Sequence, residues 1–143
     1  MSPDRGGAFD VLLGLVRTGL GGTQGAGNQF VSWIHEFDFA RAIEFIISRP
    51  ELSGVANIAS PNPVRNREFL RTLREAWGGS FGLPLSKWMI EVGAFLQRSE
   101  SELILKSRRV IPGRLLAAGF RFEYAEWPAA ARELIGRWRS RGV

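Results

Sequence analysis

The 143-residue sequence contains no cysteine, one histidine and one tyrosine. Without cysteine, the chain forms no disulfide, zinc–thiolate site or thiol nucleophile, a composition that suits a reducing compartment. Long apolar runs are also missing, because each apolar stretch is soon interrupted. Val11–Val16, for example, contains Gly14 and is followed by Arg17. A bilayer span needs roughly 20 apolar residues, and Met1–Gly7 lacks the layout of a secretion signal. We therefore expect a cytoplasmic protein with no membrane-spanning helix and no metal site.

The composition that remains is that of a globular protein with an uneven charge. Hydrophobic residues make up 45% of the sequence and charged residues 23%, which fits a single domain over 1–143. Residues 106–143 hold nine basic and three acidic side chains, whereas 1–105 hold ten basic and eleven acidic ones. A basic end attracts nucleic acid or an anionic ligand. The arginines near the terminus fit the solvated end of a helix better.

Helices and strands are predicted to alternate along the chain. Apolar spacing predicts helices over 39–49, 66–77 and 112–118, one opening at Pro84, and a last one from Pro128. Short β-branched or alternating runs predict strands at 30–35, 55–59 and 120–124. Residues 8–17 fit either a helix or a buried strand. The predicted class is α/β, or α+β for the isolated fragment, with a small sheet and several packed helices.

Two polar residues are placed where helices begin. Asp38 suits the cap or first turn of the second predicted helix, whose core face would carry Phe39, Ile43 and the Ile46–Ile47 pair. Asn66 is in the position of an N-cap before the helix with Phe69 and Leu73 on its apolar face.

A glycine-rich segment has the spacing of a dinucleotide-binding loop. Thr18–Gly25 fits T-G-x-x-G-x-x-G, but such a loop requires a strand before it and a helix directly after it. An aromatic strand pattern follows instead, and Glu44, about 20 positions on, falls inside a helix. We interpret the segment as an ordinary connection and predict no cofactor-binding residue.

Three stretches in this order resemble one family. They are Gly21–Asp38 (GGTQGAGNQFVSWIHEFD), Asn57–Asn66 (NIASPNPVRN) and Arg109–Phe122 (RVIPGRLLAAGFRF). Together they resemble the C-terminal, substrate-side region of extended short-chain dehydrogenase/reductases, in the branch of NAD-dependent or nucleoside-diphosphate-sugar epimerase-like proteins. The resemblance covers roughly residues 6–138 and implies NAD or NADP for a complete enzyme about twice as long.

The catalytic features that the family implies lie outside this sequence. The family's Rossmann half carries the glycine fingerprint and a Tyr-x-x-x-Lys pair, whereas here Tyr124 is followed four places on by Pro128. No catalytic residue is therefore predicted, and the chain alone is expected to be inactive. Many sugar-nucleotide epimerases also carry an arginine where this sequence has Val31.

The residues predicted to contact a substrate are Arg65, Asn62, Gln29, Trp33 and Arg109. Arg65 follows a predicted strand at a helix start, a place where α/β proteins bind anions. Asn62 and Gln29 lie on neighbouring loops, and Trp33 offers a stacking surface or a core residue. Arg109 and its neighbour Arg108 face either the cleft or solvent. His35 is interpreted as ordering a strand–helix junction.

Two functions of different classes follow. In the first, the chain is the substrate-binding part of a sugar-nucleotide epimerase- or dehydratase-like protein. It would then expose an apolar surface and form a homo-oligomer or pair with a separate Rossmann-half chain. In the second, it is a non-catalytic module that binds a ligand or a protein partner.

Overall fold

The computed structural model describes residues 1–83 and 107–141, which form helices around a small antiparallel sheet. The elements are, in order, α1 (Ala8–Arg17), β1 (Phe30–Val31), α2 (Glu36–Ile47), β2 (Val64–Arg65), α3 (Asn66–Trp77), α6 (Gly113–Ala117) and α7 (Trp127–Arg141). The predicted class is confirmed, and 8–17 is a helix. The helix expected from Pro84 lies outside the described residues.

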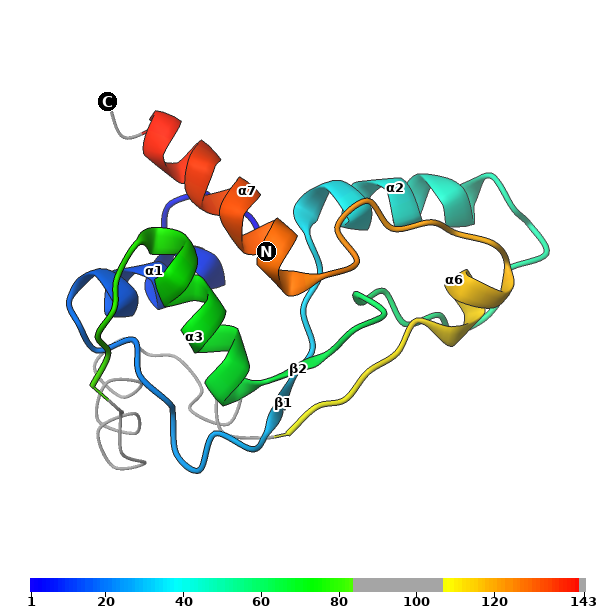
Figure 1. Ribbon diagram of the computed structural model, residues 1–143. Helices are drawn as coiled ribbons and strands as arrows, with labels where there is room; N and C mark the ends of the chain where they lie inside the picture. Colours follow the sequence, from blue (N-terminus) through cyan, green and yellow to red (C-terminus); the bar gives the residue numbers. More distant parts are fainter. Residues whose placement is uncertain (84–106, 142–143) are drawn as a thin grey trace.

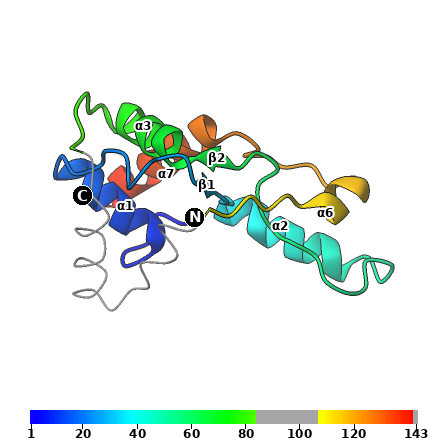
Figure 2. The same ribbon diagram turned by 90° about the horizontal axis from the view of Figure 1, so that it is seen from below.

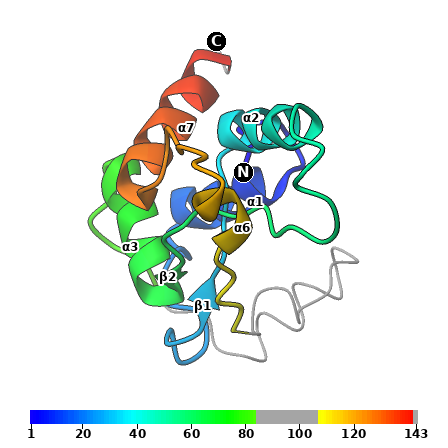
Figure 3. The same ribbon diagram turned by 90° about the vertical axis from the view of Figure 1, so that its right-hand side faces the viewer.

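The helices fall into two groups joined by the sheet (Figure 1). α1, α3 and α7 pack together on one side, while α2 and α6 extend away from them, as the view from below shows (Figure 2). Figure 3 looks from the α6 end, with α7 and α3 on one side and α2 on the other. The chain therefore has a compact three-helix part and a projecting part, and β1 runs between them.

The main core lies between α1, α3 and α7. On α3, the predicted apolar face is buried at Phe69, Leu70 and Leu73, as the 3.6-residue spacing requires. Trp127, the first residue of α7, stacks on Phe69 with ring centroids 3.9 Å apart, and its indole N–H donates to the Phe69 carbonyl. Gly78 ends α3 in the left-handed conformation, with φ of 90°, where a side chain would be strained.

The second core is small and lies within the projecting part, between α2 and α6. It consists of Ala42 of α2, Leu115 of α6 and Phe120, with Phe45 and Ile58 partly buried against them. This cluster fixes α2 to α6 through few buried side chains.

The predicted core face of α2 is wrong at three of its four positions. Phe39, Ile43 and Ile47 are exposed, Ile47 by 76% of its surface, whereas Ile46 is partly buried against the second core. Ala42 and Asp38 face inward. The apolar spacing predicted the helix correctly, but it did not say against which element the apolar side packs. In the described residues that side is open to solvent.

Two of the predicted strands are also wrong, and the third is shorter than expected. β1 covers only two of the six residues from 30 to 35. Residues 55–59 are outside the sheet, and Val55 is 87% exposed. Residues 120–124 keep an alternation of buried and exposed positions without forming a strand, because the amides of Glu123 and Tyr124 donate to the Asp38 carboxylate instead.

Both predicted helix caps are corrected by the structure. α2 begins three residues earlier than an Asp38 cap would require, and His35 is the cap: its Nδ1 accepts the Phe37 amide at 3.1 Å. Asp38 lies in the first turn of α2, the other place predicted for it. Asn66 is the first helical residue of α3 rather than its cap. The Asn66 side chain is buried against Gln24, with Asn66 Oδ1 accepting the Gln24 backbone amide at 2.9 Å.

Candidate ligand site along β1

A third segment runs beside β1, although no strand was predicted for it. The Ser107 hydroxyl accepts the Phe30 amide at 3.0 Å, and the Arg108 amide donates to the Phe30 carbonyl at 3.0 Å. Two positions on, the Ser32 hydroxyl donates to the Arg108 carbonyl and accepts the Val110 amide. Residue numbers increase in the same direction along the two segments, so 107–110 lies parallel to β1, on the side opposite β2.

This arrangement brings two of the predicted substrate contacts together. Arg65, the β2 partner of Phe30, and Arg109 each place a guanidinium 5.0 Å from the Phe30 ring centre. Such cation–π contacts orient the two cations over one ring. Arg65 also donates to the Asn28 carbonyl at 3.2 Å. The three side chains form a partly exposed face of two positive charges and an aromatic ring, which we call the Phe30 face.

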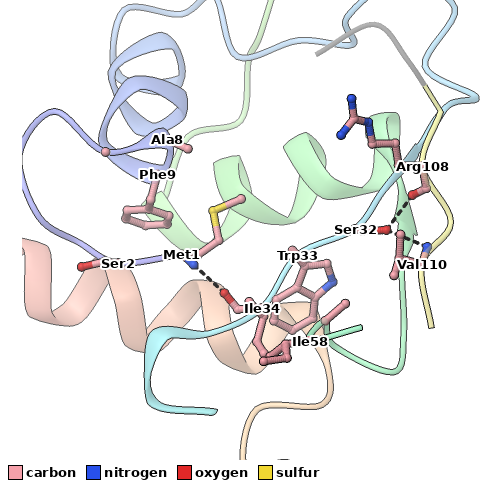
Figure 4. Close-up of a pocket in the computed structure, with 12 residues that line it drawn as sticks. Met1, Ser2, Ala8, Phe9, Ser32, Trp33, Ile34, Ile58, Arg108 and Val110 are labelled. Carbon is pink, nitrogen blue, oxygen red and sulfur yellow. Dashed lines mark hydrogen bonds between the residues drawn. The ribbon is translucent and has the colours of Figure 1, made fainter. Parts of the chain in front are cut away.

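The opposite side of β1 is apolar. Val31 and Val64 point into the main core, as alternation along a strand requires. Beyond the carboxyl end of β1 lies an open cavity of about 560 Å³, bounded by residues that include Phe9, Trp33 and Ile58 (Figure 4). Its lining comes from the amino-terminal segment and the start of α1, from residues 32–34 after β1, from residues 58–59, and from Arg108 and Val110. Such concave, mostly apolar surfaces with few polar groups are typical of small-molecule sites.

The structure distinguishes Arg108 from Arg109. Arg108 belongs to the lining of the cavity, whereas Arg109 lies over the Phe30 ring. Sequence reasoning missed Phe30, Ser32 and Ser107 as residues that build this site. The adjacent arginines Arg108 and Arg109 were the one local hint that this segment belongs to a site. The hydrogen bonds that bring it to Ser32 join positions 76 to 78 apart in the chain, which no local pattern reveals.

The other three residues predicted to contact a substrate form hydrogen bonds within the chain. Trp33 is buried with its ring edge toward Trp127, and its indole N–H donates to the Asn62 carbonyl. Asn62 donates through its side chain to Glu126 at 2.5 Å, and Gln29 donates to the Gln24 carbonyl at 2.9 Å. Only Trp33 of these three lines the cavity.

The glycine-rich segment connects α1 to β1, so a helix precedes it and a strand follows it. The Gly22 amide donates to the Leu83 carbonyl, and the buried Gln24 amide donates to Asn66. Gly21 is closely packed, because a Cβ atom at this position would lie 2.5 Å from Val16 Cγ2. The segment therefore lacks the strand before it and the helix directly after it that a phosphate loop requires.

A second hollow, of about 380 Å³, lies between α2 and α7 and is lined by His35, Tyr124, Glu133 and Arg137, among others. His35 is buried and stacks on Tyr124 with ring centroids 4.1 Å apart. Burial, together with the charges of Glu133 and Glu123, raises the pKa of Tyr124 above its ordinary value.

The basic carboxyl end is engaged within the chain. Arg137 pairs with Glu36 and with Glu133, Arg139 donates to the Trp77 carbonyl, and Arg141 pairs with an aspartate near the amino terminus. Within 1–83 and 107–141, no three acidic or histidine side chains gather in a way that would hold a metal ion. In the same ranges, no helix is long and apolar enough to cross a membrane.

Comparison with known proteins connects this chain to one group. A domain family described as "Domain of unknown function (DUF1731)" matches residues 85–134. The human epimerase family protein SDR39U1 is 35% identical over 130 residues, which cover 91% of this chain and 44% of the human protein. The epimerase family protein YfhF of Bacillus subtilis is 34% identical over 118 residues, covering 80% of this chain and 37% of that protein.

The structural match agrees with the sequence match. The crystal structure of human SDR39U1 (isoform 2) with NADPH superposes with a TM-score of 0.82 at 34% identity, over 92% of this chain and 44% of the human chain. This chain therefore spans less than half the length of the relatives it matches. Over most of its own length, it is a homologue of the epimerase family proteins.

Proposed function

We propose that this chain is the carboxyl-terminal, substrate-side part of an NAD(P)-dependent, epimerase-like short-chain dehydrogenase/reductase. The observation that carries the proposal is the match to the human relative solved with NADPH, which covers nearly all of this chain but under half of that protein. The nucleotide cofactor and the catalytic pair would then come from the part of the relatives that has no counterpart here.

The outer side of α2 supports a partner of this kind. Three large apolar side chains, Phe39, Ile43 and Ile47, lie exposed on it. A helix with such a side is normally buried against another element. We call this surface the α2 outer face and propose that it packs against the nucleotide-binding half, whether that half belongs to the same chain or to another.

The Phe30 face and the neighbouring cavity support a substrate site along β1. The two guanidinium groups offer forked donors to a phosphate or carboxylate, and the cavity wall, including Trp33, offers apolar contact. A sugar nucleotide has both kinds of group, and so have other anionic small molecules. We propose Arg65 and Arg109 as the anion contacts and Trp33 as part of the apolar wall. Direct substrate contacts of Asn62 and Gln29 stay predictions.

The test uses the chain alone and in mixture with a chain spanning the uncovered amino-terminal part of human SDR39U1. Calorimetry with NADPH is expected to give no binding for this chain alone and stoichiometric binding for the mixture. Sedimentation should show a 1:1 complex. Stoichiometric NADPH binding by this chain alone would contradict the proposal. It would indicate that the Thr18–Gly25 segment is a nucleotide-binding loop after all.

A pair of matched variants tests the docking surface. Phe39→Glu with Ile43→Glu places two charges on the α2 outer face, and we expect the complex to weaken at least tenfold, because both carboxylates would be desolvated there. Arg71→Glu changes the charge of the exposed side of α3 and is expected to leave the complex unchanged. Equal effects of the two changes would exclude the α2 outer face as the interface.

The second candidate function is a non-catalytic module that binds a ligand or a protein partner. It is favoured by the fact that residues of this chain line the cavity and build the Phe30 face. This function predicts a monodisperse monomer that binds an anionic ligand with the Phe30 face and forms no complex with the nucleotide-binding half.

A further inference from the structure

The imidazole of His35 joins two helices that otherwise meet little. His35 lies at the start of α2 with 1% of its surface exposed. Its Nδ1 accepts the Phe37 amide at 3.1 Å, and its Nε2 lies 2.7 Å from Glu133 Oε2 on α7. The ring is covered on one side by Tyr124. One buried side chain thus caps α2 and bonds to α7 at the same time.

These two contacts fix the tautomer of the neutral ring. The Phe37 amide is a donor, so Nδ1 must be the unprotonated nitrogen, and Nε2 carries the hydrogen that is donated to Glu133. A second proton has only Nδ1 to occupy. A proton on Nδ1 would point at the Phe37 N–H, which is itself a donor. The cap would be lost, since an imidazolium accepts no hydrogen bond.

Charged groups surround the ring from each element packed on it. From α7, Glu133 favours an imidazolium, while Arg137, with a guanidinium nitrogen 3.5 Å from Nε2, opposes it. Arg137 is itself held by Glu36 of α2. From the segment before α7, Tyr124 and Glu123 line the same hollow. From the amino-terminal segment, the Met1 amine donates to the Ile34 carbonyl, next to His35. Protonation of the ring would therefore disturb a connected network rather than a single bond.

We propose that His35 is a pH-sensitive latch: in its neutral Nε2–H form it ties the first turn of α2 to α7, and its protonation releases that turn. The first turn is followed directly by the α2 outer face, so the latch would control how well that face is presented. Its use in docking rests on the proposed function. The latch itself is a property of this chain alone. An experiment can therefore refute the latch without refuting the proposed function, and the reverse.

Nitrogen-15 NMR of the imidazole on the 143-residue chain tests the proposal first. At neutral pH, the Nε2–H tautomer is expected. As the pH is lowered through the titration of the ring, the exchange protection factor of the Phe37 amide should fall about tenfold, close to the loss expected for a helix cap. A Nδ1–H tautomer, or a protection factor that stays constant through the titration, would overturn the latch.

Variants at two positions separate the latch from general acid destabilisation. His35→Asn keeps a good capping oxygen without a group that titrates in this range, and the Phe37 protection factor should become independent of pH. Glu133→Gln keeps an acceptor for the Nε2 hydrogen, so that hydrogen should stay protected from exchange with solvent, whereas Glu133→Ala removes the acceptor and should expose it. If His35→Asn does not fold, the wild-type measurement decides alone. Equal exchange of the Nε2 hydrogen in the two Glu133 variants would refute the link to α7.

Discussion

The side-chain amides of Gln24 and Asn66 face each other inside the protein, 42 positions apart in sequence. Asn66 Oδ1 accepts the Gln24 backbone amide at 2.9 Å, and Asn66 Nδ2 donates to Gln24 Oε1 at 3.0 Å. Both residues are almost fully buried. This pair attaches the glycine-rich connection to the first turn of α3, so it holds the connection that leads into β1.

Asn66→Ala removes both bonds and leaves two polar groups of Gln24 without partners. Each buried unsatisfied group costs about 1–3 kcal/mol, so we expect a loss of about 2–4 kcal/mol in the free energy of unfolding, measured in urea. Arg71→Ala, on the exposed side of the same helix, should stay within about 0.5 kcal/mol of the wild type. Equal losses for the two variants would show that the amide pair contributes nothing specific.

The Asp38 carboxylate accepts three donors although it is fully buried. The amides of Glu123 and Tyr124 lie 2.9 Å and 2.8 Å from its oxygens, and Arg41 donates at 3.0 Å. Removing one partner of such a buried set costs about 3–5 kcal/mol, and we expect that loss for Asp38→Ala. Asp38→Asn keeps one acceptor oxygen and should lose less. Denaturant titration of both, beside Glu44→Ala on the exposed side of α2, checks the order.

Two glycines near the start of the chain should respond in opposite directions to alanine. Gly14 lies within α1 with open space around the position of a Cβ, and helix propensity predicts a gain of about 0.5–1 kcal/mol for Gly14→Ala. At Gly21 the Cβ would meet Val16 Cγ2 at 2.5 Å and Val16 Cα at 2.7 Å. Because the second of these is backbone, Gly21→Ala should destabilise by about 1–3 kcal/mol. Thermal melting of both variants decides the matter, and a gain at Gly21 would contradict the packing described here.

Asp10 gives a pH dependence with a defined sign. Hydrogen bonds from the Gly6 amide and from the Trp138 indole, each 3.0 Å long, lower the pKa of Asp10 below 3.8. A carboxyl with a lowered pKa in the folded state contributes stability above its unfolded pKa, and that contribution is lost as the pH falls. The difference in unfolding free energy between the wild type and Asp10→Asn should therefore be constant near pH 6 and shrink from about pH 4 downward. A difference that grows on acidification would refute this account.

Local patterns predicted the helices well and their surroundings poorly. The apolar spacing of α3 and α7 was enough to place Phe69, Leu73 and Leu134 in the core, because each helix has one strongly apolar face and a neighbour to receive it. On α2 the same kind of spacing put Phe39 and Ile43 in a core that the described residues do not contain. Periodicity detects an apolar side, but whether that side is covered depends on what else is present.

The strands and the site depend on contacts that no local pattern contains. Val55–Ala59 reads as a buried strand, yet within the described residues it has no strand beside it. Arg65 and Arg109 were both predicted as ligand contacts, but their meeting over Phe30 was not, since it results from the parallel alignment of 107–110 with β1. His35 was correctly interpreted as ordering the junction, whereas its capping of α2 was assigned to Asp38.

The stacking of Trp127 on Phe69 also sets the order in which the chain acquires its structure. The Trp127 indole bonds to a carbonyl 58 positions earlier, and the alignment of 107–110 with β1 joins residues 76 to 78 positions apart. Contacts this distant along the chain must close large loops before they stabilise anything, which slows folding. During synthesis, α1 and α3 emerge before α7, and the surface of α3 that packs on α7 stays uncovered until then. A ribosome-bound chain stopped before Trp127 would therefore be a target for chaperones, and release of the last helix would be the step that commits it to the native state.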